Sequence, residues 1–272
     1  MILGWRNQMV DEETKTMIWR GFVIALTLLV HLLVSVKAHA DETVMLKTGY
    51  MSLDASGSFG ASAAGLAATP VDVDSTVRFG RSNQATVEAA VQLGDIRAAL
   101  NYFPLSFSGD GVLGSAVQYN GQTFAAGDTV HASLKADVFD ASLTYYMVNM
   151  DDLPSRLQLG VEAAVKLVHA SSTIQDRTTG VTQTVSTTLP MPTLGARGRV
   201  AISDFIGLAG RAGYLSFAGN HFLDSEMQME FSPVPTVGLY AGYRLIDLKV
   251  NRSGVLLDHA FSGPFAGGFV RF

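Results

Sequence analysis

Residues 157–167 read Leu-Gln-Leu-Gly-Val-Glu-Ala-Ala-Val-Lys-Leu, and this stretch decides the fold. Every odd position from Leu157 to Leu167 is apolar, whereas Glu162 and Lys166 stand at even positions. A helix would scatter the apolar residues around its circumference, but a strand has a side-chain period of two and collects them on one face. The stretch therefore predicts a β-strand with one apolar face and one polar face.

The same alternation recurs along the chain. No run of 18 apolar residues follows residue 40, although the mean hydropathy of +0.25 and the hydrophobic share of 48% are high. Strands with one face in lipid and one in a polar lumen are typical of transmembrane β-barrels, whereas a soluble β-sandwich would turn its apolar face inward. The further alternating runs lie at residues 87–93, 96–102, 130–137, 194–202, 206–214, 224–231 and 237–244.

The N-terminal segment has the features of an export signal. Residues 22–36 are almost all apolar, Arg20 precedes them, and Ala-His-Ala follows at 38–40. A basic flank, a short apolar core and a small-residue exit are typical of a secretory signal peptide, and the core is shorter than the ~20 residues of a spanning helix. We expect a signal peptide over residues 1–40 and one mature domain over 41–272. An exported, highly apolar chain favours the barrel over the sandwich.

The start of the leader has an alternative. Asp11, Glu12 and Glu13 precede Met17, whereas the first part of a signal peptide is normally basic. A start at Met17 would give a more ordinary leader, with Met-Ile-Trp-Arg-Gly ahead of the apolar core. Both starts predict the same cleavage after Ala40.

The composition narrows the function classes. The chain has 19 basic and 24 acidic residues and a net charge of −5, which argues against nucleic acid as a partner, because phosphate binding needs a basic surface. It has no Cys, so disulfides, Cys-ligated zinc and a Cys nucleophile are excluded. We expect no cofactor and no metal site.

Counting the runs predicts an all-β, antiparallel barrel of ten strands, with eight as the alternative. The first strand is expected at about 43–53 and the last at about 259–272. Short turns alternate with long connections, as expected for periplasmic turns and extracellular loops. Residues 131–137 put odd positions in the lumen, whereas 140–144 put even positions there, so we expect a β-bulge near 138–139. The long connections are expected at 54–84, 109–127, 173–187, 217–222 and 250–258.

The C-terminal sequence adds a resemblance. Ala-Gly-Tyr-Arg at 241–244 and Ser-Gly-Pro-Phe-Ala-Gly-Gly-Phe-Val-Arg-Phe at 262–272 resemble small proteobacterial outer-membrane β-barrels of the OmpA/OmpW-like type, and more narrowly an uncharacterised family of them. The resemblance covers about 85–272. It implies the cell outer membrane, contact with its lipid and lipopolysaccharide, and insertion by the outer-membrane assembly machinery, for which Phe272 is part of the signal. It implies no catalytic residues.

The polar faces collect many charges of nearly balanced sign. Inside a small barrel, paired charges would satisfy one another, because an unpaired buried charge is costly. The set therefore predicts a structural ion-pair network, and a narrow polar channel is the alternative. The charged residues expected to line the lumen are Glu88, Arg97, Lys135, Asp137, Glu162, Lys166, Arg197, Arg199, Arg211, Asp224, Glu226, Glu230, Arg244 and Arg271.

Three roles follow from this interpretation. The first is a structural or narrow-pore role for small solutes. The second is binding or adhesion through the long surface loops. The third is a lipid-acting enzyme, for which His131 and Ser133, with Asp137 further along, are the pair considered. No G-x-S-x-G, H-E-x-x-H or P-loop pattern is present, so we predict no enzyme and no catalytic residues.

Overall fold

Long antiparallel strands make up most of the structure. The computed structural model describes residues 42–62, 67–150, 156–217, 220–234, 236–252 and 255–272. The long strands are β1 (Glu42–Ala61), β3 (Ser82–Leu93), β4 (Ile96–Val112), β7 (Thr129–Met150), β8 (Leu157–Asp176), β9 (Thr182–Ala201), β10 (Ile206–Phe217), β11 (Asn220–Val234), β12 (Val237–Arg252) and β13 (Val255–Arg271).

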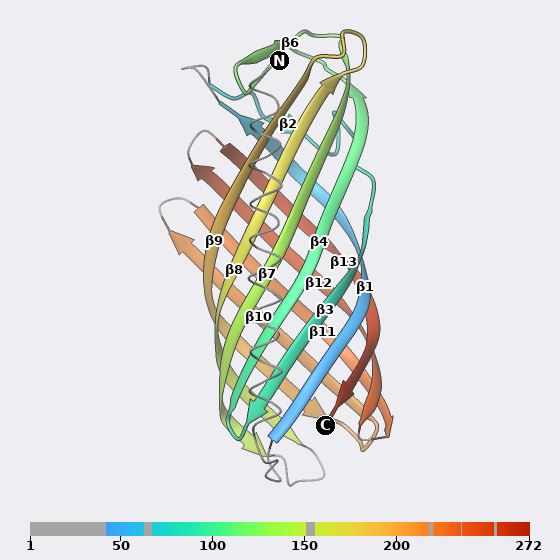
Figure 1. The fold of residues 1–272 in the computed structure, drawn as a ribbon, viewed down its shortest axis with the longest axis vertical. Helices are drawn as coiled ribbons and strands as arrows, with labels where there is room; N and C mark the ends of the chain where they lie inside the picture. The colour runs from blue at the N-terminus through green and yellow to red at the C-terminus, as the bar shows by residue number, and fades with distance from the viewer. Residues whose placement is uncertain (1–41, 63–66, 151–155, 218–219, 235, 253–254) are drawn as a thin grey trace, which may run out of the picture. The chain divides into compact units, whose positions relative to one another are not determined.

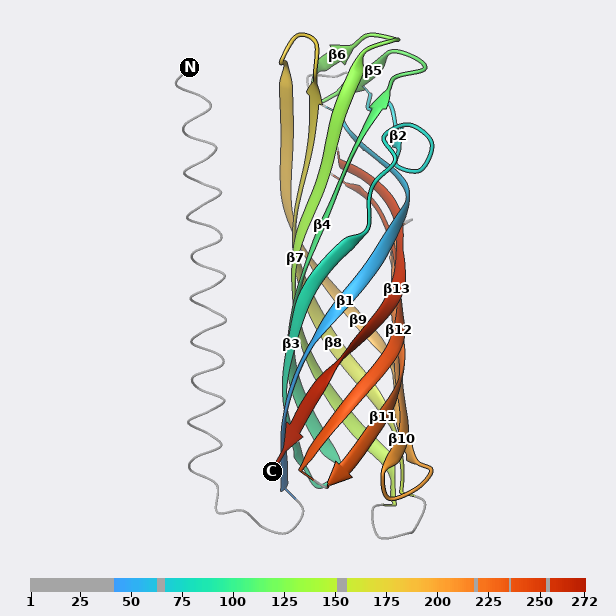
Figure 2. The ribbon, with the colours of Figure 1, turned by 90° about the vertical axis from the view of Figure 1, so that its right-hand side faces the viewer.

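These ten strands close into a barrel (Figure 1 and Figure 2). They follow one another in chain order, and β13 pairs with β1 from Met45↔Arg271 to Ala61↔Val255. Closure pairs the first of these strands with the last, so that their backbone groups do not meet lipid unpaired. The predicted count of ten strands is confirmed, and the alternative of eight is wrong.

The expected signal peptide, residues 1–40, lies outside the described residues. Within the described residues, no helix is long and apolar enough to cross a membrane.

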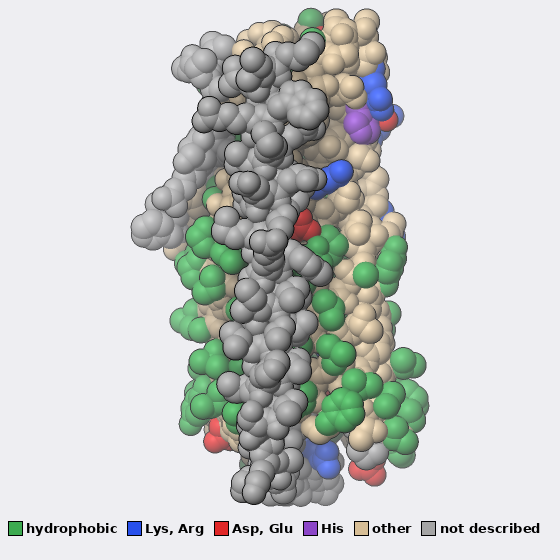
Figure 3. All heavy atoms as spheres, viewed as in Figure 1, with side chains coloured by type: hydrophobic (Ala, Val, Ile, Leu, Met, Phe, Trp, Pro, Cys, Tyr) green, Lys and Arg blue, Asp and Glu red, His purple; other side chains and the backbone are tan. Residues whose placement is uncertain are grey.

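The barrel wall has two halves of opposite polarity. One half contains the start of β1 and the end of β13. Its outer face is apolar, with Leu143, Val161 and Leu194 at least 44% exposed, and its inner face is charged. In the other half, the outer face is polar and the inner face is apolar. Figure 3 shows the hydrophobic side chains gathered below a region where charged side chains and His appear. The apolar outer band, here called the belt, is the surface expected to contact lipid.

The two halves meet at one level around the barrel. Phe103, Val138 and Val168 pair side by side in one row and point inward. The neighbouring inward residues on the belt side are polar, namely Asn101, Asp140 and Lys166.

Strand β7 corrects one prediction. It pairs without interruption with β4 and β8 across residues 138–139, so the expected bulge is absent, and the register shift lies between Tyr146 and Val148. Val130 is fully buried inside, whereas Lys135 and Asp137 lie on the outer face. The prediction that Lys135 and Asp137 line the lumen is wrong. From residue 130 to residue 146 the side-chain phase of β7 stays the same; what changes is the surroundings of its two faces.

Most of the expected long connections are strands. β1 continues to Ala61, and the β8–β9 hairpin continues to a turn over 177–181, where the Asp176 N–H donates to the Val181 carbonyl oxygen at 2.9 Å. The strands β7, β8 and β9 rise above the β10–β11 and β12–β13 hairpins (Figure 1). The outer face there is rich in Ser and Thr, which suits water rather than lipid.

Short elements cover the tall end of the barrel. They are β2 (Val71–Asp72), beside β1, and a hairpin of β5 (Val117–Tyr119) and β6 (Gln122–Phe124). This hairpin, here called the cap, is held on one side by Asn120 N–H donating to the Ala61 carbonyl oxygen at 2.9 Å. On the other side, the buried Tyr119 hydroxyl donates to the Ser172 carbonyl oxygen of β8 at 3.0 Å. The cap therefore crosses the mouth of the barrel from β1 to β8.

The belt can be tested on β8. Val161 lies in the middle of its apolar outer face. We expect Val161→Lys to lower the free energy of unfolding by about 2–4 kcal/mol, because the ammonium would lie near the middle of the hydrocarbon. Thr173 points outward on the same strand above the belt, so Thr173→Lys should change stability by less than about 1 kcal/mol. Denaturant unfolding in lipid vesicles measures both, and equal losses would contradict the position of the belt.

Candidate functional site

Two acidic residues organise the interior of the belt half. Asp224 on β11 has a side chain that is 2% exposed. Its carboxylate lies 2.8 Å from Lys166 Nζ, 2.9 Å from two nitrogens of Arg244, and 3.4 Å from Arg211 Nη2. Asp140 on β7 pairs with Lys166 and lies 2.9 Å from Arg211 Nη1. The barrel thus brings together charged side chains from five strands, β7, β8, β10, β11 and β12.

Further ion pairs extend this centre. Arg211 Nε lies 3.2 Å from Glu226 and its Nη1 lies 3.5 Å from Glu162. Glu162 accepts a hydrogen bond from Arg197 Nε at 2.5 Å and one from the Thr144 hydroxyl at 3.1 Å. We call this set, together with the pairs below, the ionic network.

The network continues with ion pairs on strands β3, β4, β9, β11 and β13. Arg97 and Glu88 pair at 2.5 Å, with both side chains less than 10% exposed. Glu230 lies 3.0 Å from Arg199 and 3.5 Å from Arg271. Positive and negative charges therefore alternate through the belt half, and each carboxylate has a cation beside it, which offsets the cost of burying both.

Most of the charged residues named from the sequence lie on one side of the barrel wall. Apart from Lys135 and Asp137, which face outward, the residues expected in the lumen point into the barrel and belong to the network. The expected partner of Lys166, however, was Glu162 on the same strand, and the structure gives it Asp140 and Asp224 instead. The interior residues are Glu88, Arg97, Glu162, Lys166, Arg197, Arg199, Arg211, Asp224, Glu226, Glu230, Arg244 and Arg271.

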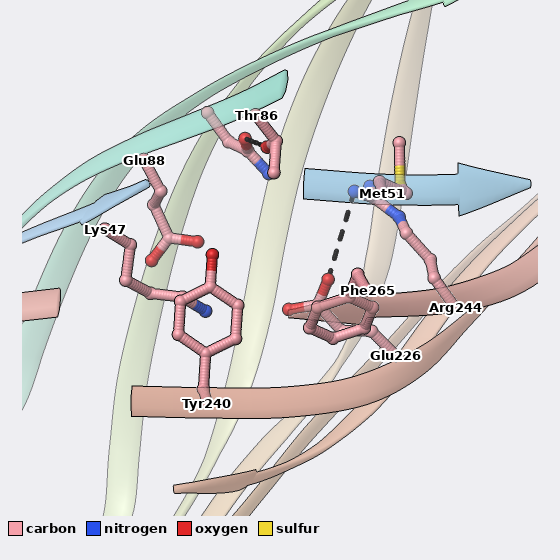
Figure 4. A pocket seen from close by; sticks show the side chains of 9 residues that line it. Lys47, Met51, Thr86, Glu88, Glu226, Tyr240, Arg244 and Phe265 are labelled. Carbon is pink, nitrogen blue, oxygen red and sulfur yellow. Dashed lines mark hydrogen bonds and ion pairs between the residues drawn. The ribbon is translucent and has the colours of Figure 1, made fainter. Parts of the chain in front are cut away.

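A small charged cavity lies within the network. Figure 4 shows Lys47 and Glu88 directed toward Tyr240 on one side, with Glu226 and Arg244 on the other. Lys47 Nζ lies 4.3 Å from the centre of the Tyr240 ring and donates to Gln228 at 2.8 Å. The sequence analysis did not name Lys47 or Tyr240. Lys47 stands at an odd position of β1 and Tyr240 at an even position of β12, and in each strand these positions face inward.

The pair considered for catalysis is not assembled. His131 and Ser133 lie on the outer face of β7, and His131 Nδ1 is 3.0 Å from Asp110. Asp137 accepts a hydrogen bond from the Tyr102 hydroxyl at 2.8 Å instead of orienting the imidazole. Within the described residues, no group of three or more His, Cys, Asp or Glu could hold a metal ion.

A closed antiparallel barrel with an apolar outer belt and a charged interior is characteristic of outer-membrane β-barrel proteins. The chain is a small outer-membrane β-barrel protein, and its location is the outer membrane of a Gram-negative cell. Its fold is similar to that of the outer-membrane protease OmpT from Escherichia coli, with a TM-score of 0.55, 11% identity, and coverage of 88% of this chain and 99% of that chain.

Two further solved structures are similar more distantly. Neisserial surface protein A gives a TM-score of 0.36 at 15% identity, covering 85% of this chain and 97% of that one. Ail of Yersinia pestis gives 0.37 at 10% identity, covering 86% and 100%. No family model and no curated protein matches the sequence.

Proposed function

We propose that this protein is a sealed outer-membrane barrel with a structural role, which does not conduct ions. The observation that carries the proposal is the succession of two barriers along the axis. The ionic network fills the belt half with paired charges, and above it the interior becomes apolar at the level of Phe103, Val138 and Val168.

Both barriers oppose the passage of ions. A small ion entering the network would have to displace residues that already neutralise one another. An ion that passed it would then enter a section lined by Phe, Leu and Val, where it would lose its hydration without gaining a partner. The cap closes the far end, and burial raises the pKa of the Tyr119 hydroxyl to about 12, so this group stays a hydrogen-bond donor to Ser172.

Single-channel recording tests this role. The mature protein is refolded, and folding is verified by its heat-modifiable mobility on gels before it is added to planar lipid bilayers in potassium chloride. We expect no steady conductance steps above those of the lipid alone. Reproducible steps of uniform size from the folded protein would contradict the proposal and favour the narrow pore.

Surface binding is a second candidate, because β8 and β9 hold a polar surface above the belt. Hydroxyl groups face one another across these strands: Thr173 and Thr184 at 2.9 Å, and Ser171 and Ser186 at 3.4 Å. Whole-cell binding by cells that display the protein, compared with cells whose chain has the 177–181 turn shortened, would test this role. A lipid-acting role stays a prediction that no described cluster supports.

A further inference from the structure

The upper half of β9 has one open edge. On one side, β9 pairs with β8 from Thr182 to Val200, which is nearly its whole length. On the other side, pairing with β10 is confined to the part of β9 from Leu194 downward, because the β10–β11 hairpin ends lower than β9 (Figure 1). Within the described residues, no strand lies beside β9 on this side over residues 182–193.

The backbone of this edge points away from β8 at every second residue. In an antiparallel ladder, a residue directs both its N–H and its C=O to the same neighbouring strand. The Ala201 N–H donates to the Arg156 carbonyl oxygen at 2.8 Å, and the Val181 carbonyl oxygen accepts from the Asp176 N–H at 2.9 Å, so the odd residues of β9 bond to β8. The residues that direct their backbone groups to the open edge are therefore Thr182, Thr184, Ser186 and Thr188.

The upper edge carries none of the usual protection against strand addition. Edge strands in native proteins are commonly protected by charged residues or Pro, whereas residues 182–189 read Thr-Gln-Thr-Val-Ser-Thr-Thr-Leu. Pro190 and Pro192 follow at even positions, where a Pro removes an edge-facing N–H but no bond to β8. Pro190 pairs with Leu167 of the belt, so an added strand would end where the belt begins.

The two faces of the edge determine which partner fits it. The inward side chains of Val185 and Leu189 are partly buried against the apolar core of the upper barrel. The outward side chains of Thr184, Ser186 and Thr188 are exposed hydroxyls. A strand beside β9 would continue the wall, and side chains on the same face of neighbouring strands contact each other. The edge therefore fits an uncharged extended segment in which apolar residues alternate with Ser or Thr.

A second copy of the chain in the same membrane does not fit this edge. The twofold axis of such a dimer would run along the membrane normal, so the two β9 strands would be parallel and identical residues would lie at the same height. In a parallel pair, however, a residue that faces the partner strand lies opposite a residue that faces away from it. Two copies of Thr184 at one height would face each other with like backbone groups.

We propose that the edge of β9 over residues 182–188 binds an extended segment of another protein, which adds a strand to the barrel wall outside the membrane. Backbone hydrogen bonds to the even residues hold this segment, and its alternating side chains provide the selectivity. The proposal rests on the surface-binding role described above and does not depend on whether the barrel conducts ions.

Amide hydrogen exchange, resolved by NMR on the full mature protein in lipid nanodiscs, tests the site. The probe is a short capped peptide of alternating Thr and Val, and the control is the same peptide methylated at every backbone nitrogen. With the probe at about ten times its dissociation constant, exchange at the even residues from Thr182 to Thr188 should slow about tenfold, because only the free edge exchanges. The amides of Gln183, Val185 and Thr187 bond to β8 and should be protected with or without the peptide.

Two variants at one position separate the backbone from the side chain. Ser186→Pro removes an edge-facing N–H and leaves the bonds to β8, as Pro190 and Pro192 already do on the same strand, whereas Ser186→Ala removes only the hydroxyl. Peptide affinity, measured by fluorescence anisotropy, should fall about tenfold in Ser186→Pro, a loss on the scale of one hydrogen bond. It should stay unchanged in Ser186→Ala. Heat-modifiable mobility verifies that both variants fold.

Several results would contradict the proposal. No saturable binding of the probe, equal binding of the methylated peptide, or equal affinity in the two variants would overturn the edge as the site. Slow exchange of the even amides without any peptide would mean that the edge is already covered, and would overturn a separate protein as its partner. Cells that bind through the 177–181 turn, while the purified protein does not bind the probe, would overturn the edge but keep the surface-binding role.

Discussion

Replacing Asp224 by Asn is expected to lower the free energy of unfolding by about 3–5 kcal/mol, the cost of breaking a buried ion pair from one side. The amide has nearly the same size as the carboxylate, so packing is kept and only the charge is removed. Lys166, Arg211 and Arg244 all lie within 3.4 Å of the Asp224 carboxylate. Asp224 is the nearest anion to Arg244, the second-nearest to Lys166 and the third-nearest to Arg211, so three buried cations would each lose a partner at once.

The matched control is Asp258 on β13. It forms a single ion pair with Lys249 at 2.8 Å, and both side chains are close to half exposed. Asp258→Asn should therefore cost less than about 1 kcal/mol, as is usual for surface pairs. Guanidinium unfolding of both variants in lipid vesicles measures the difference. Similar small losses at both positions would mean that water reaches the network and screens its charges.

Loss of the aromatic ring of Phe272 is expected to reduce assembly several-fold while leaving the folded barrel stable. The Phe272 side chain is 77% exposed, so little packing is lost when it is removed. Its backbone exchanges hydrogen bonds with Val44 at 3.0 and 2.9 Å, and Phe272→Ser keeps both. The resemblance to outer-membrane barrels implies that the terminal aromatic is read during assembly, and an aromatic ring at this end suits the membrane interface.

Phe205 provides the control. It lies in the turn between β9 and β10, at the same end of the barrel, and is 53% exposed. Phe205→Ser removes another exposed ring from the same interface but not from the last strand. The folded, heat-modifiable fraction in isolated outer membranes should fall for Phe272→Ser and stay near normal for Phe205→Ser. A parallel decline in both variants would point to interface anchoring and not to an assembly signal.

The sequence predicted the barrel because period-two alternation is a local property of each strand. It was sufficient for the strand count and for the inward face of β8, where Lys166 lies. It failed on β7, because apolar residues at even positions were assumed to face lipid. Val130 and Leu134 are apolar because they form an interior core above the belt. Periodicity tells which residues share a face but does not tell which solvent that face meets.

The partners within the network were beyond prediction for a different reason. Lys166 pairs with Asp140 on the neighbouring strand and with Asp224 across the barrel. Which residues meet depends on the register of several strands and on the curvature of the wall. No local stretch of sequence determines either of these. The apolar interior above the network is likewise built from seven strands, so no single stretch of sequence predicted it.

The exchange of polarity at one level of the wall also fixes how deep the protein sits in its bilayer. Sliding the barrel outward would expose belt residues such as Leu167 to water, and sliding it inward would bring Lys135 and the Arg81–Asp54 ion pair into hydrocarbon. The inner and outer faces of the wall change polarity at the same height, so a shift of the barrel in either direction is unfavourable. In bilayers of different thickness, the lipid tails next to the protein should stretch or compress, while the barrel keeps its vertical register.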